Sequence, residues 1–428
     1  GTNGFQGPTN QAINDTGGIL RTCESDYSRV SSVGIVCCSD SQKNIMLWVI
    51  NTSNSSAISF TNLSQAKYAH IEQSCNVQFL NGSNVALVVY ENGTTGDPTE
   101  TDNSFLARVF NGDKLTLGSP IKISFDTPQK RTVGNGANYT NSFAIKQRPG
   151  TKNQVAVTFE LTGLDELCVQ CFDDSAGIVL LNITSTGGLI NLFNYTTDNT
   201  TNPEQESNGN GGNYQDGAWT SDGLYFLYLI SNQTLSISTG NITISIVNLT
   251  NTSNISIVPP FAVESSVTTS VGGYGDAPQI RACTIPNQTD RIVYIGNHHT
   301  SGIFVPFSSV FSINRSAEKP LIPGAESRGG ERDNNEWNIN VFCYSSEVST
   351  KVTLGYIESE GTQNAKRVDI FRYYGANKSY DVSDMDNAET SANFALDDIE
   401  HLKCTPFPEG DGCVFTTVDL VSDLTSGA

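Results

Sequence analysis

The stretch that decides the fold runs from Asp216 to Phe261 and reads DGAWTSDGLYFLYLISNQTLSISTGNITISIVNLTNTSNISIVPPF. It contains four short apolar runs, each bounded by turn-forming residues: Gly217–Thr220, Leu224–Ile230, Ile242–Leu249 and Ile255–Phe261. Between the first two runs, Ser221-Asp222-Gly223 predicts a tight turn. The stretch therefore predicts four consecutive strands.

The runs differ in their hydrophobic pattern. Leu224–Ile230 is almost continuously apolar, which is typical of a strand that is buried on both faces. In the third run, Ile242, Ile244 and Ile246 alternate with polar residues, and this period of two predicts a half-exposed strand. A short inner strand, a buried strand, a half-exposed strand and an edge strand, in this order, are typical of one blade of a β-propeller.

Similar groups of runs recur along the whole chain at intervals of about 50 to 75 residues. They predict an all-β protein with a single domain, a seven-bladed β-propeller of four-stranded antiparallel blades. The expected blades are approximately residues 17–62, 68–124, 138–196, 214–261, 275–323, 336–383 and 396–428. The last blade runs out of chain before its outer strand, so residues 1–13 are expected to supply that strand and close the ring.

The chain resembles the seven-bladed β-propeller superfamily, because Thr220-Ser221-Asp222-Gly223-Leu224-Tyr225 is similar to the turn-and-strand motif of propellers whose blades carry a Ser-(Pro)-Asp-Gly turn. The resemblance implies a fold and no activity. Two all-β sandwich domains are the alternative. No linker rich in Pro, Gly and Ser divides the sequence into halves, and this favours the propeller.

The composition disfavours two classes of partner. The chain has 428 residues, with 44 acidic and 24 basic side chains, which gives a formal net charge of −20. Such a surface repels phosphate backbones and anionic membranes, so no nucleic-acid partner is expected. No apolar run approaches the roughly 18 to 20 residues that a membrane-spanning helix needs, so no membrane insertion is expected either.

Two features predict a secreted, extracellular glycoprotein. The chain has ten cysteines, an even number. It also has eighteen Asn-X-Ser/Thr sequons, most of which fall at predicted strand ends and turns, where a glycan can project into water. The sequons lie at Asn14, Asn51, Asn54, Asn62, Asn81, Asn92, Asn138, Asn182, Asn194, Asn199, Asn232, Asn241, Asn248, Asn251, Asn254, Asn287, Asn314 and Asn377.

Five cysteines fall at the predicted ends of first strands: Cys23, Cys75, Cys283, Cys343 and Cys404. Equivalent positions in adjacent blades are neighbours around a propeller ring. This predicts the disulfide pairs Cys23–Cys75 and Cys283–Cys343.

The other cysteines allow less definite pairings. Cys404 and Cys413 flank a predicted turn, which favours a bridge across a hairpin. A local structural bridge is expected between Cys168 and Cys171. For the adjacent Cys37 and Cys38 a vicinal bridge is strained, and crossed pairing with Cys168 and Cys171 is the alternative.

No catalytic set stands out in the sequence. The neighbours His298 and His299 are expected to be exposed turn residues, because adjacent side chains point apart and no carboxylate lies close by in sequence. Paired carboxylates are enough for a glycosidase. The candidates are Asp397, Asp398 and Glu400, or Asp333 with Glu336, which the sequence does not distinguish from solvated acids.

One acidic loop has a composition that suits a metal ion. Asp381, Asp384 and Asp386 lie within six residues of each other in a predicted connection between blades. Carboxylate oxygens at this density are ligands that Ca²⁺ prefers. A calcium site is one interpretation and a solvated acidic loop is the other; no further cofactor is expected.

The connections from the outer strand of one blade to the inner strand of the next are long, and the later ones predict a binding face. They carry Tyr274, Arg328, Arg332, Asp333 and Trp337. The function that this favours is structural, adhesive or assembly-related, as a subunit or displayed module of an extracellular fibre, coat or matrix. The expected partners are further copies of the chain, other extracellular glycoproteins, or glycans. A propeller enzyme acting on glycans and a soluble lectin-like propeller are the alternatives.

Overall fold

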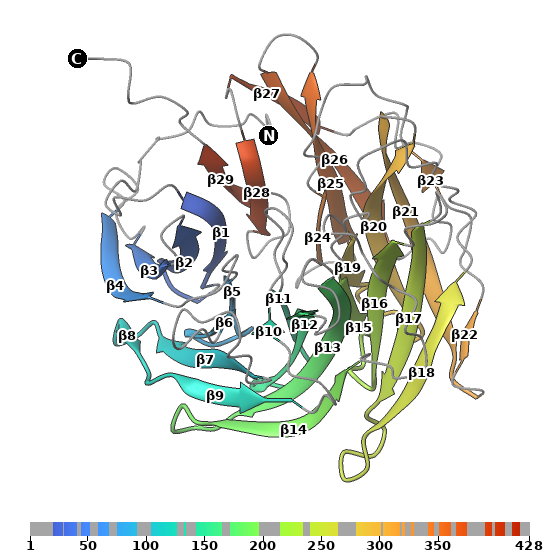
Figure 1. The fold of residues 1–428 in the computed structure, drawn as a ribbon, viewed down its shortest axis with the longest axis horizontal. Helices are drawn as coiled ribbons and strands as arrows, with labels where there is room; N and C mark the ends of the chain where they lie inside the picture. Colours follow the sequence, from blue (N-terminus) through green and yellow to red (C-terminus); the bar gives the residue numbers. More distant parts are fainter. Residues whose placement is uncertain are drawn as a thin grey trace.

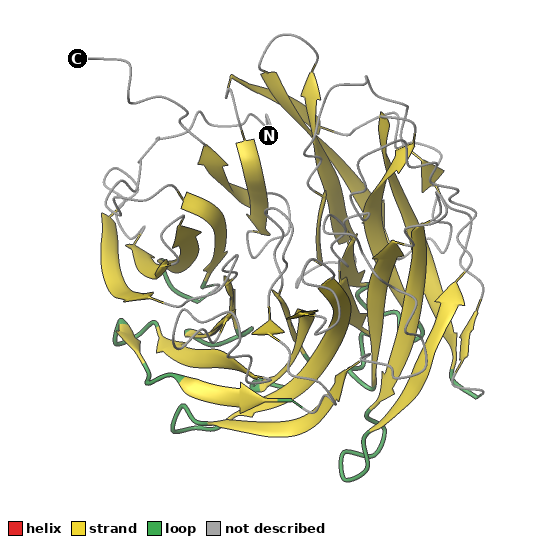
Figure 2. Ribbon diagram, in the orientation of Figure 1, coloured by secondary structure: helices red, strands yellow, loops and turns green. Residues whose placement is uncertain are grey.

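The structure is a computed structural model. It describes residues 20–28, 30–40, 44–51, 59–67, 75–91, 104–125, 132–133, 143–164, 172–196, 215–233, 240–263, 280–300, 303–316, 319–321, 327–328, 341–345, 351–360, 365–374, 390–395, 399–406 and 413–419. The regular secondary structure in these ranges consists of β-strands (Figure 2). The described ranges accordingly hold no helix with the length and apolarity that crossing a bilayer requires.

The strands of the first half of the chain form three antiparallel sheets. The first sheet contains β1 (Leu20–Tyr27), β2 (Val33–Asp40), β3 (Asn44–Asn51) and β4 (Ser59–Lys67). The second contains β5 (Cys75–Phe79), β6 (Val85–Glu91), β7 (Ser104–Asn111), β8 (Thr116–Leu117) and β9 (Ile121–Ser124). The third contains β10 (Thr132–Val133), β11 (Phe143–Gln147), β12 (Gln154–Leu164), β13 (Phe172–Ile183) and β14 (Leu189–Thr196).

The remaining strands continue the same pattern. The fourth sheet contains β15 (Gln215–Trp219), β16 (Tyr225–Gln233), β17 (Gly240–Asn248) and β18 (Ser256–Val263). The fifth contains β19 (Ile280–Thr284), β20 (Arg291–Thr300), β21 (Ile303–Asn314), β22 (Lys319–Leu321) and β23 (Ser327–Arg328). The sixth contains β24 (Val341–Ser345), β25 (Lys351–Glu360), β26 (Ala365–Tyr374) and β27 (Thr390–Ala395), and β28 (Ile399–Pro406) pairs with β29 (Cys413–Asp419) in the last.

Successive sheets follow one another around a common centre (Figure 1). Within the first, fourth and sixth sheets, each strand pairs with the next one along the chain. The inner strands contact each other in the order β1, β5, β11, β15, β19, β24 and β28, and β28 also contacts β1. Antiparallel meander sheets with adjacent inner strands are the arrangement of a β-propeller. Residues 1–13, the expected closing strand, lie outside the described residues.

The stretch from Asp216 to Phe261 forms the four strands of the fourth sheet, as predicted. Residues Tyr225–Ile230 of β16 are buried throughout, which confirms the prediction of a strand covered on both faces. The prediction of a half-exposed third strand is wrong for residues 244–249, which are all buried. The reason is that β17 is packed on both sides: Ile246 contacts residues of the fifth sheet, and Val247 contacts residues of the third.

The apolar core lies between neighbouring sheets. Between the second and third sheets, the ring of Phe105 lies 5.4 Å from the rings of Phe143 and Phe159, measured between centroids. Similar clusters join the first sheet to the second, the fourth to the fifth, and the fifth to the sixth. Because burial of apolar surface contributes about 25 cal/mol per Å², these junctions fix the sheets relative to one another. They also fix the polar groups that the inner strands and their turns carry.

Candidate functional site

Most of the predicted binding residues lie outside the described residues. This applies to Tyr274, Arg332, Asp333 and Trp337, and to the calcium candidates Asp381, Asp384 and Asp386. Arg328 lies on β23, where its backbone pairs with that of Phe307 on β21. Within the described ranges, no group of three or more His, Cys, Asp or Glu side chains is placed to hold a metal ion.

Two of the acid and histidine predictions fall on strands. His298 and His299 were expected in a turn, and this is wrong: both lie on β20, where they pair with Val305 and Phe304 of β21. The physical reason is that β20 and β21 form a hairpin longer than the apolar pattern indicated, so that its pairing continues to Thr300 and Ile303. Among the acid candidates, Glu400 lies on β28, whereas Asp397, Asp398, Asp333 and Glu336 lie outside the described residues.

Three disulfides are present among the described residues: Cys23–Cys38, Cys37–Cys75 and Cys283–Cys343. The last confirms a prediction and joins β19 to β24. The predicted pair Cys23–Cys75 is wrong, and so are both pairings considered for Cys37 and Cys38, the vicinal bridge and the crossed pairing with Cys168 and Cys171. Cys168 and Cys171 themselves lie outside the described residues. Cys404 and Cys413 lie on the paired strands β28 and β29. The structure does not describe their side chains, so the bridge between them stays a prediction.

The register of β1 and β2 explains the correction. Cys23 lies directly opposite Cys38, and their Cα atoms are 4.1 Å apart. Adjacent residues of a strand point to opposite faces, so Cys37 points away from Cys23 and toward the second sheet, where it meets Cys75. The prediction placed Cys23 and Cys75 at equivalent positions. In the structure Cys23 lies within β1, whereas Cys75 is the first residue of β5.

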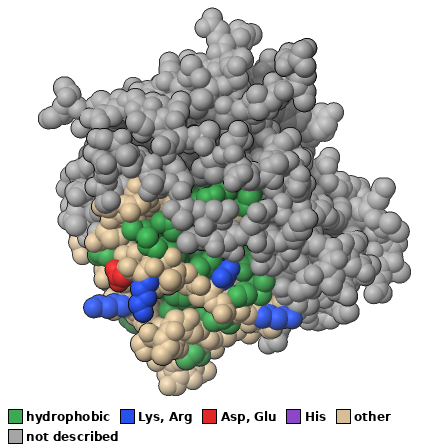
Figure 3. Space-filling model, turned by 90° about the vertical axis from the view of Figure 1, so that its left-hand side faces the viewer, with side chains coloured by type: hydrophobic (Ala, Val, Ile, Leu, Met, Phe, Trp, Pro, Cys, Tyr) green, Lys and Arg blue, Asp and Glu red, His purple; other side chains and the backbone are tan. Residues whose placement is uncertain are grey.

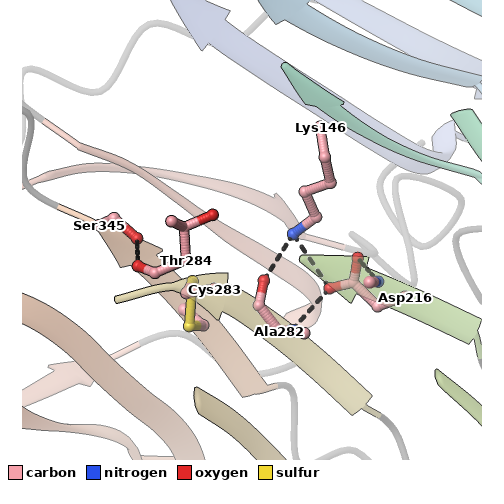
Figure 4. The surroundings of a disulfide bond; sticks show 8 residues. Lys146, Asp216, Ala282, Cys283, Thr284 and Ser345 are labelled. Carbon is pink, nitrogen blue, oxygen red and sulfur yellow. Dashed lines mark hydrogen bonds and ion pairs between the residues drawn. A yellow bond between two sulfur atoms is a disulfide. The ribbon is translucent and has the colours of Figure 1, made fainter. Parts of the chain in front are cut away.

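The main polar cluster of the inner strands is centred on Asp216 of β15 (Figure 4). The Asp216 side chain has an exposed fraction of 0%. Its Oδ1 accepts a hydrogen bond from the backbone N–H of Gly217 at 2.8 Å, and its Oδ2 accepts one from the N–H of Ala282 at 2.8 Å. Oδ2 also accepts a bond from Nζ of Lys146 at 3.1 Å, and the same Nζ donates to the carbonyl oxygen of Ala282 at 2.9 Å.

This cluster joins three sheets. Lys146 belongs to β11 of the third sheet, Asp216 to β15 of the fourth, and Ala282 to β19 of the fifth. A buried carboxylate is tolerated when a counter-charge and hydrogen-bond donors compensate for its lost hydration, and here one ammonium group and two backbone N–H groups do so. Trp219 adds a further link, since its indole Nε1 donates to the carbonyl oxygen of Lys146 at 2.9 Å. The chemistry of this cluster is therefore that of a cross-link between sheets.

A second polar cluster is built on the turn between β15 and β16. Gly223 has a φ of +69°, in the left-handed region that glycine adopts without strain, and an added Cβ would lie 2.7 Å from the carbonyl oxygen of Pro149. Within the turn, Oδ1 of Asp222 accepts hydrogen bonds from Oγ1 of Thr220 at 2.7 Å and from the N–H of Leu224 at 3.2 Å. The local Thr-Ser-Asp-Gly sequence thus fixes the Asp222 carboxylate.

Two arginines from the flanking sheets bind this turn. Arg315, which follows β21 in the fifth sheet, donates from Nη2 to Oδ2 of Asp222 at 2.7 Å and lies 5.0 Å from the centroid of the Tyr225 ring. Arg148, which follows β11 in the third sheet, donates from Nε to the carbonyl oxygen of Gly223 at 2.7 Å. The turn at the C-terminal end of β15 therefore connects the same three sheets as Asp216 does.

The charged groups of this second cluster affect one another's pKa. Partial burial raises the pKa of Asp222, but the hydrogen bonds from Thr220, the Leu224 amide and Arg315, together with the charge of Arg315, outweigh it and hold the pKa below its ordinary value of 3.8. Burial lowers the pKa of Arg148 from its ordinary value, while the negative charge of Asp222 acts in the opposite direction. At neutral pH the Asp222 carboxyl group is therefore ionised.

The sequons differ in their accessibility. Asn81, Asn251, Asn254 and Asn287 are exposed, whereas Asn51, Asn182, Asn194 and Asn314 are half-buried. Asn248 is 9% exposed, and its Oδ1 accepts hydrogen bonds from N and Oγ1 of Thr250 at 2.8 and 2.7 Å. The geometry favours glycans on the turns and disfavours one at the end of β17.

The surface in view in Figure 3 is mixed. Lys and Arg side chains are prominent on its described part, although the whole chain has a net charge of −20. Hydrophobic side chains appear between polar atoms. The large hydrophobic residues that are exposed among the described residues are Val30, Leu115, Ile190 and Leu192, at 41 to 55%.

Sequence reasoning missed Lys146 and Asp216 as an interacting pair. Each is the one charged residue in its short first strand, Phe-Ala-Ile-Lys-Gln for β11 and Gln-Asp-Gly-Ala-Trp for β15. A charge in such a strand is the signal that could have singled them out, because it needs a partner when buried. Their pairing across 70 residues of sequence depends on the arrangement of the sheets.

Comparison with known proteins gives likeness in structure alone. No protein-family model and no curated protein sequence matches the chain. The Nup133 β-propeller domain of Vanderwaltozyma polyspora has a TM-score of 0.48 and 9% identity, and the match covers 93% of this chain and 91% of that one. The α-L-arabinanase of Penicillium chrysogenum, solved with arabinobiose, has a TM-score of 0.43 and 12% identity, with 82% and 94% covered.

A third example is the NanB sialidase of Streptococcus pneumoniae, with a TM-score of 0.40, 9% identity, and 82% and 68% of the two chains covered. The TM-scores of all three matches lie below 0.5. The propeller arrangement described above rests on the chain's own strand order and on the contacts between its inner strands.

Proposed function

We propose that the chain is a secreted, disulfide-linked β-propeller that acts as a rigid binding or assembly module, as a subunit or displayed part of an extracellular fibre, coat or matrix. The observation that carries the proposal is the pair of polar clusters at Asp216 and Asp222, each of which ties the fourth sheet to its neighbours. Sheets fixed in this way hold the segments that connect them at constant spacing, as a binding face requires.

The disulfides support the proposed extracellular location. Protein disulfides persist in oxidising surroundings such as the extracellular space, and three are present among the described residues. If the chain passes through a glycosylating secretory pathway, glycopeptide mass spectrometry of the native protein should find glycans at the exposed sequons Asn81, Asn251, Asn254 and Asn287. Asn248 is the matched control, since its side chain is buried and should be unmodified. Vacancy at all four exposed sequons would contradict secretion by this route.

We also propose that the ring has seven blades and that residues 1–13 supply the outer strand of the last one. The proposal is supported by the contacts that β28 makes with both β24 and β1. Deletion of residues 1–13 should lower the melting temperature, since it removes a ladder of hydrogen bonds from an edge strand. An unchanged melting curve would contradict this closure.

The proposed binding face consists of Tyr274, Arg328, Arg332, Asp333 and Trp337, with Asp381, Asp384 and Asp386 as calcium ligands. Its partners are further copies of the chain, other extracellular glycoproteins, or glycans. Analytical ultracentrifugation of the native glycosylated protein over a wide concentration range, with and without Ca²⁺, tests self-assembly. We expect association that grows with concentration. A monomer under all conditions would reject self-assembly and leave a soluble lectin-like propeller.

A panel of glycoside substrates tests the opposing function. The proposed module should show no turnover above that of a denatured sample. Robust hydrolysis that is lost in Asp333→Asn, Glu336→Gln or Asp398→Asn would replace the proposal with a glycan-acting enzyme. Retention of the melting temperature in each variant is the control for correct folding.

A further inference from the structure

The junction between the third and fourth sheets buries three hydroxyl groups. Thr158 on β12, Tyr228 on β16 and Ser245 on β17 each have an exposed fraction of 0%. None of their side-chain oxygens has a hydrogen-bond partner among the residues that the structure describes. Because buried hydroxyl groups in folded proteins are paired, either with protein or with ordered water, the three need a common explanation.

The strand registers turn all three side chains toward the space between the third and fourth sheets. On β12, Val157 and Phe159 pack against the second sheet, so Thr158 between them faces the fourth sheet. Tyr228 packs in the cluster that the third and fourth sheets share, and Ser245 lies directly opposite Tyr228 in the β16–β17 pair. Paired residues of an antiparallel ladder share a face, so Ser245 also faces the third sheet.

An acidic side chain borders this space. Glu160 lies two residues after Thr158 on the same face of β12 and is 1% exposed. Burial raises the pKa of Tyr228 well above its usual 10, and the charges of Tyr195 and Glu160 raise it further, which is consistent with both groups lying near the Tyr228 hydroxyl. On this face of the third sheet, Ala156 precedes Thr158 by two residues and Ala176 lies directly opposite Glu160, while the larger Ile178 lies opposite Thr158.

We propose that the space between β12 and the β16–β17 hairpin is an internal water-binding site, formed by the hydroxyl groups of Thr158, Tyr228 and Ser245 beside the carboxyl group of Glu160. An internal water typically makes about three hydrogen bonds to groups that otherwise have no partner, and the site supplies this number of hydroxyls. Its ligand is water, bound between two sheets, and it holds them together without a covalent link or an ion pair.

Single removals of a hydroxyl test the site by the sign of their effect. Tyr228→Phe and Thr158→Val remove one hydroxyl each from the full-length protein. If water joins the groups, each change leaves the others with a broken network and lowers the melting temperature, by about 2 °C or more. The double variant should then lose less than the sum of the two single losses. Without bound water, Tyr228→Phe removes an unpaired buried hydroxyl and raises the melting temperature.

Oxygen-17 magnetic relaxation dispersion gives a second readout, because it measures the number of long-lived internal waters. We expect this number to fall in Tyr228→Phe and to stay constant in the control Tyr225→Phe, which removes a hydroxyl from the same strand but on the side of the fifth sheet. Ser245→Ala replaces Tyr228→Phe if that variant does not fold. A raised melting temperature, or an unchanged number of internal waters, would overturn the proposal.

Discussion

The junction between the first and second sheets and the junction between the third and fourth are held by different chemistry. The first has the covalent bond Cys37–Cys75, beside the hydrogen bond from the N–H of Phe79 to Oδ2 of Asp26 at 2.5 Å. The second relies, among the described residues, on the ion pair Lys146–Asp216, on Arg148 and on apolar packing. A disulfide restricts the unfolded chain, whereas polar contacts stabilise the folded one. Two junctions between neighbouring sheets can thus respond differently to reductant and to pH.

The largest expected effect is the loss of a disulfide. In the chain-entropy view, a bridge stabilises more when it closes a longer loop. The separations are 60 residues for Cys283–Cys343, 38 for Cys37–Cys75 and 15 for Cys23–Cys38. Paired Cys→Ser changes should therefore lower the free energy of unfolding by about 4 kcal/mol for the first two bridges and about 3 kcal/mol for the third, measured by urea titration.

Cys23–Cys38 is the matched control in this series, because it lies within one hairpin and joins no two sheets. Full reduction of the native protein breaks these bridges together, so it should cause a larger loss than any one of the paired variants. If removal of Cys23–Cys38 lowers the free energy of unfolding more than removal of Cys37–Cys75 does, loop length does not determine how much each bridge stabilises the protein.

The second largest effect is expected at the junction between the third and fourth sheets, where Lys146 and Asp216 form an ion pair. Asp216→Asn leaves the Lys146 ammonium without its counter-charge and weakens the bonds to the Gly217 and Ala282 amides. Because Lys146 is 23% exposed, water compensates in part, and we expect a loss of about 2 to 3 kcal/mol. Lys146→Met tests the other partner. In a double-mutant cycle the two changes should couple by about 1 kcal/mol or more, and additive losses would show that the pair does not act as a unit.

A smaller effect, dependent on pH, is expected for the turn. Asp222→Asn removes a charge that accepts bonds from Thr220, Leu224 and Arg315, and should cost about 1.5 kcal/mol at about pH 7. Since the folded pKa of Asp222 lies below its ordinary 3.8, the contribution is complete above 3.8 and disappears as the pH falls through the lowered value. Urea titrations of both proteins over this range should show the difference shrinking toward acid. A difference independent of pH would contradict the role of the charge.

The smallest effect is expected for Arg148→Lys. Lysine keeps the positive charge but cannot make the planar pair of bonds that Arg148 makes, from Nε to the Gly223 carbonyl and from Nη1 to Oε1 of Gln154. We expect a loss of about 1 kcal/mol and a change in the fluorescence of Trp219, over whose ring the guanidinium lies at 5.8 Å. Unchanged emission with unchanged stability would show that the contact does not contribute.

Sequence patterns predict features that depend on residues close together in the chain and miss features that depend on how distant segments pack. The strands of residues 216–261 could be predicted, because the Ser-Asp-Gly turn and the apolar runs act over a few residues. The burial of β17 on both faces could not, since it depends on the sheets placed on either side of it. Likewise, the partner of Cys37 depends on the register of β1 against β2. Of the candidate site, only the turn at Asp222 was visible in the sequence.

The opposite orientation of Cys37 and Cys38 has a mechanical consequence. A force that pulls on Cys23 passes through its disulfide to Cys38, across one peptide bond to Cys37, and through the second disulfide to Cys75. This path reaches the second sheet by covalent bonds alone. Strands β3 and β4 lie in the loop between Cys38 and Cys75, so they carry none of the tension along it. Tension applied at Cys23 would thus pass to the second sheet while the outer strands of the first sheet, β3 and β4, stay unloaded.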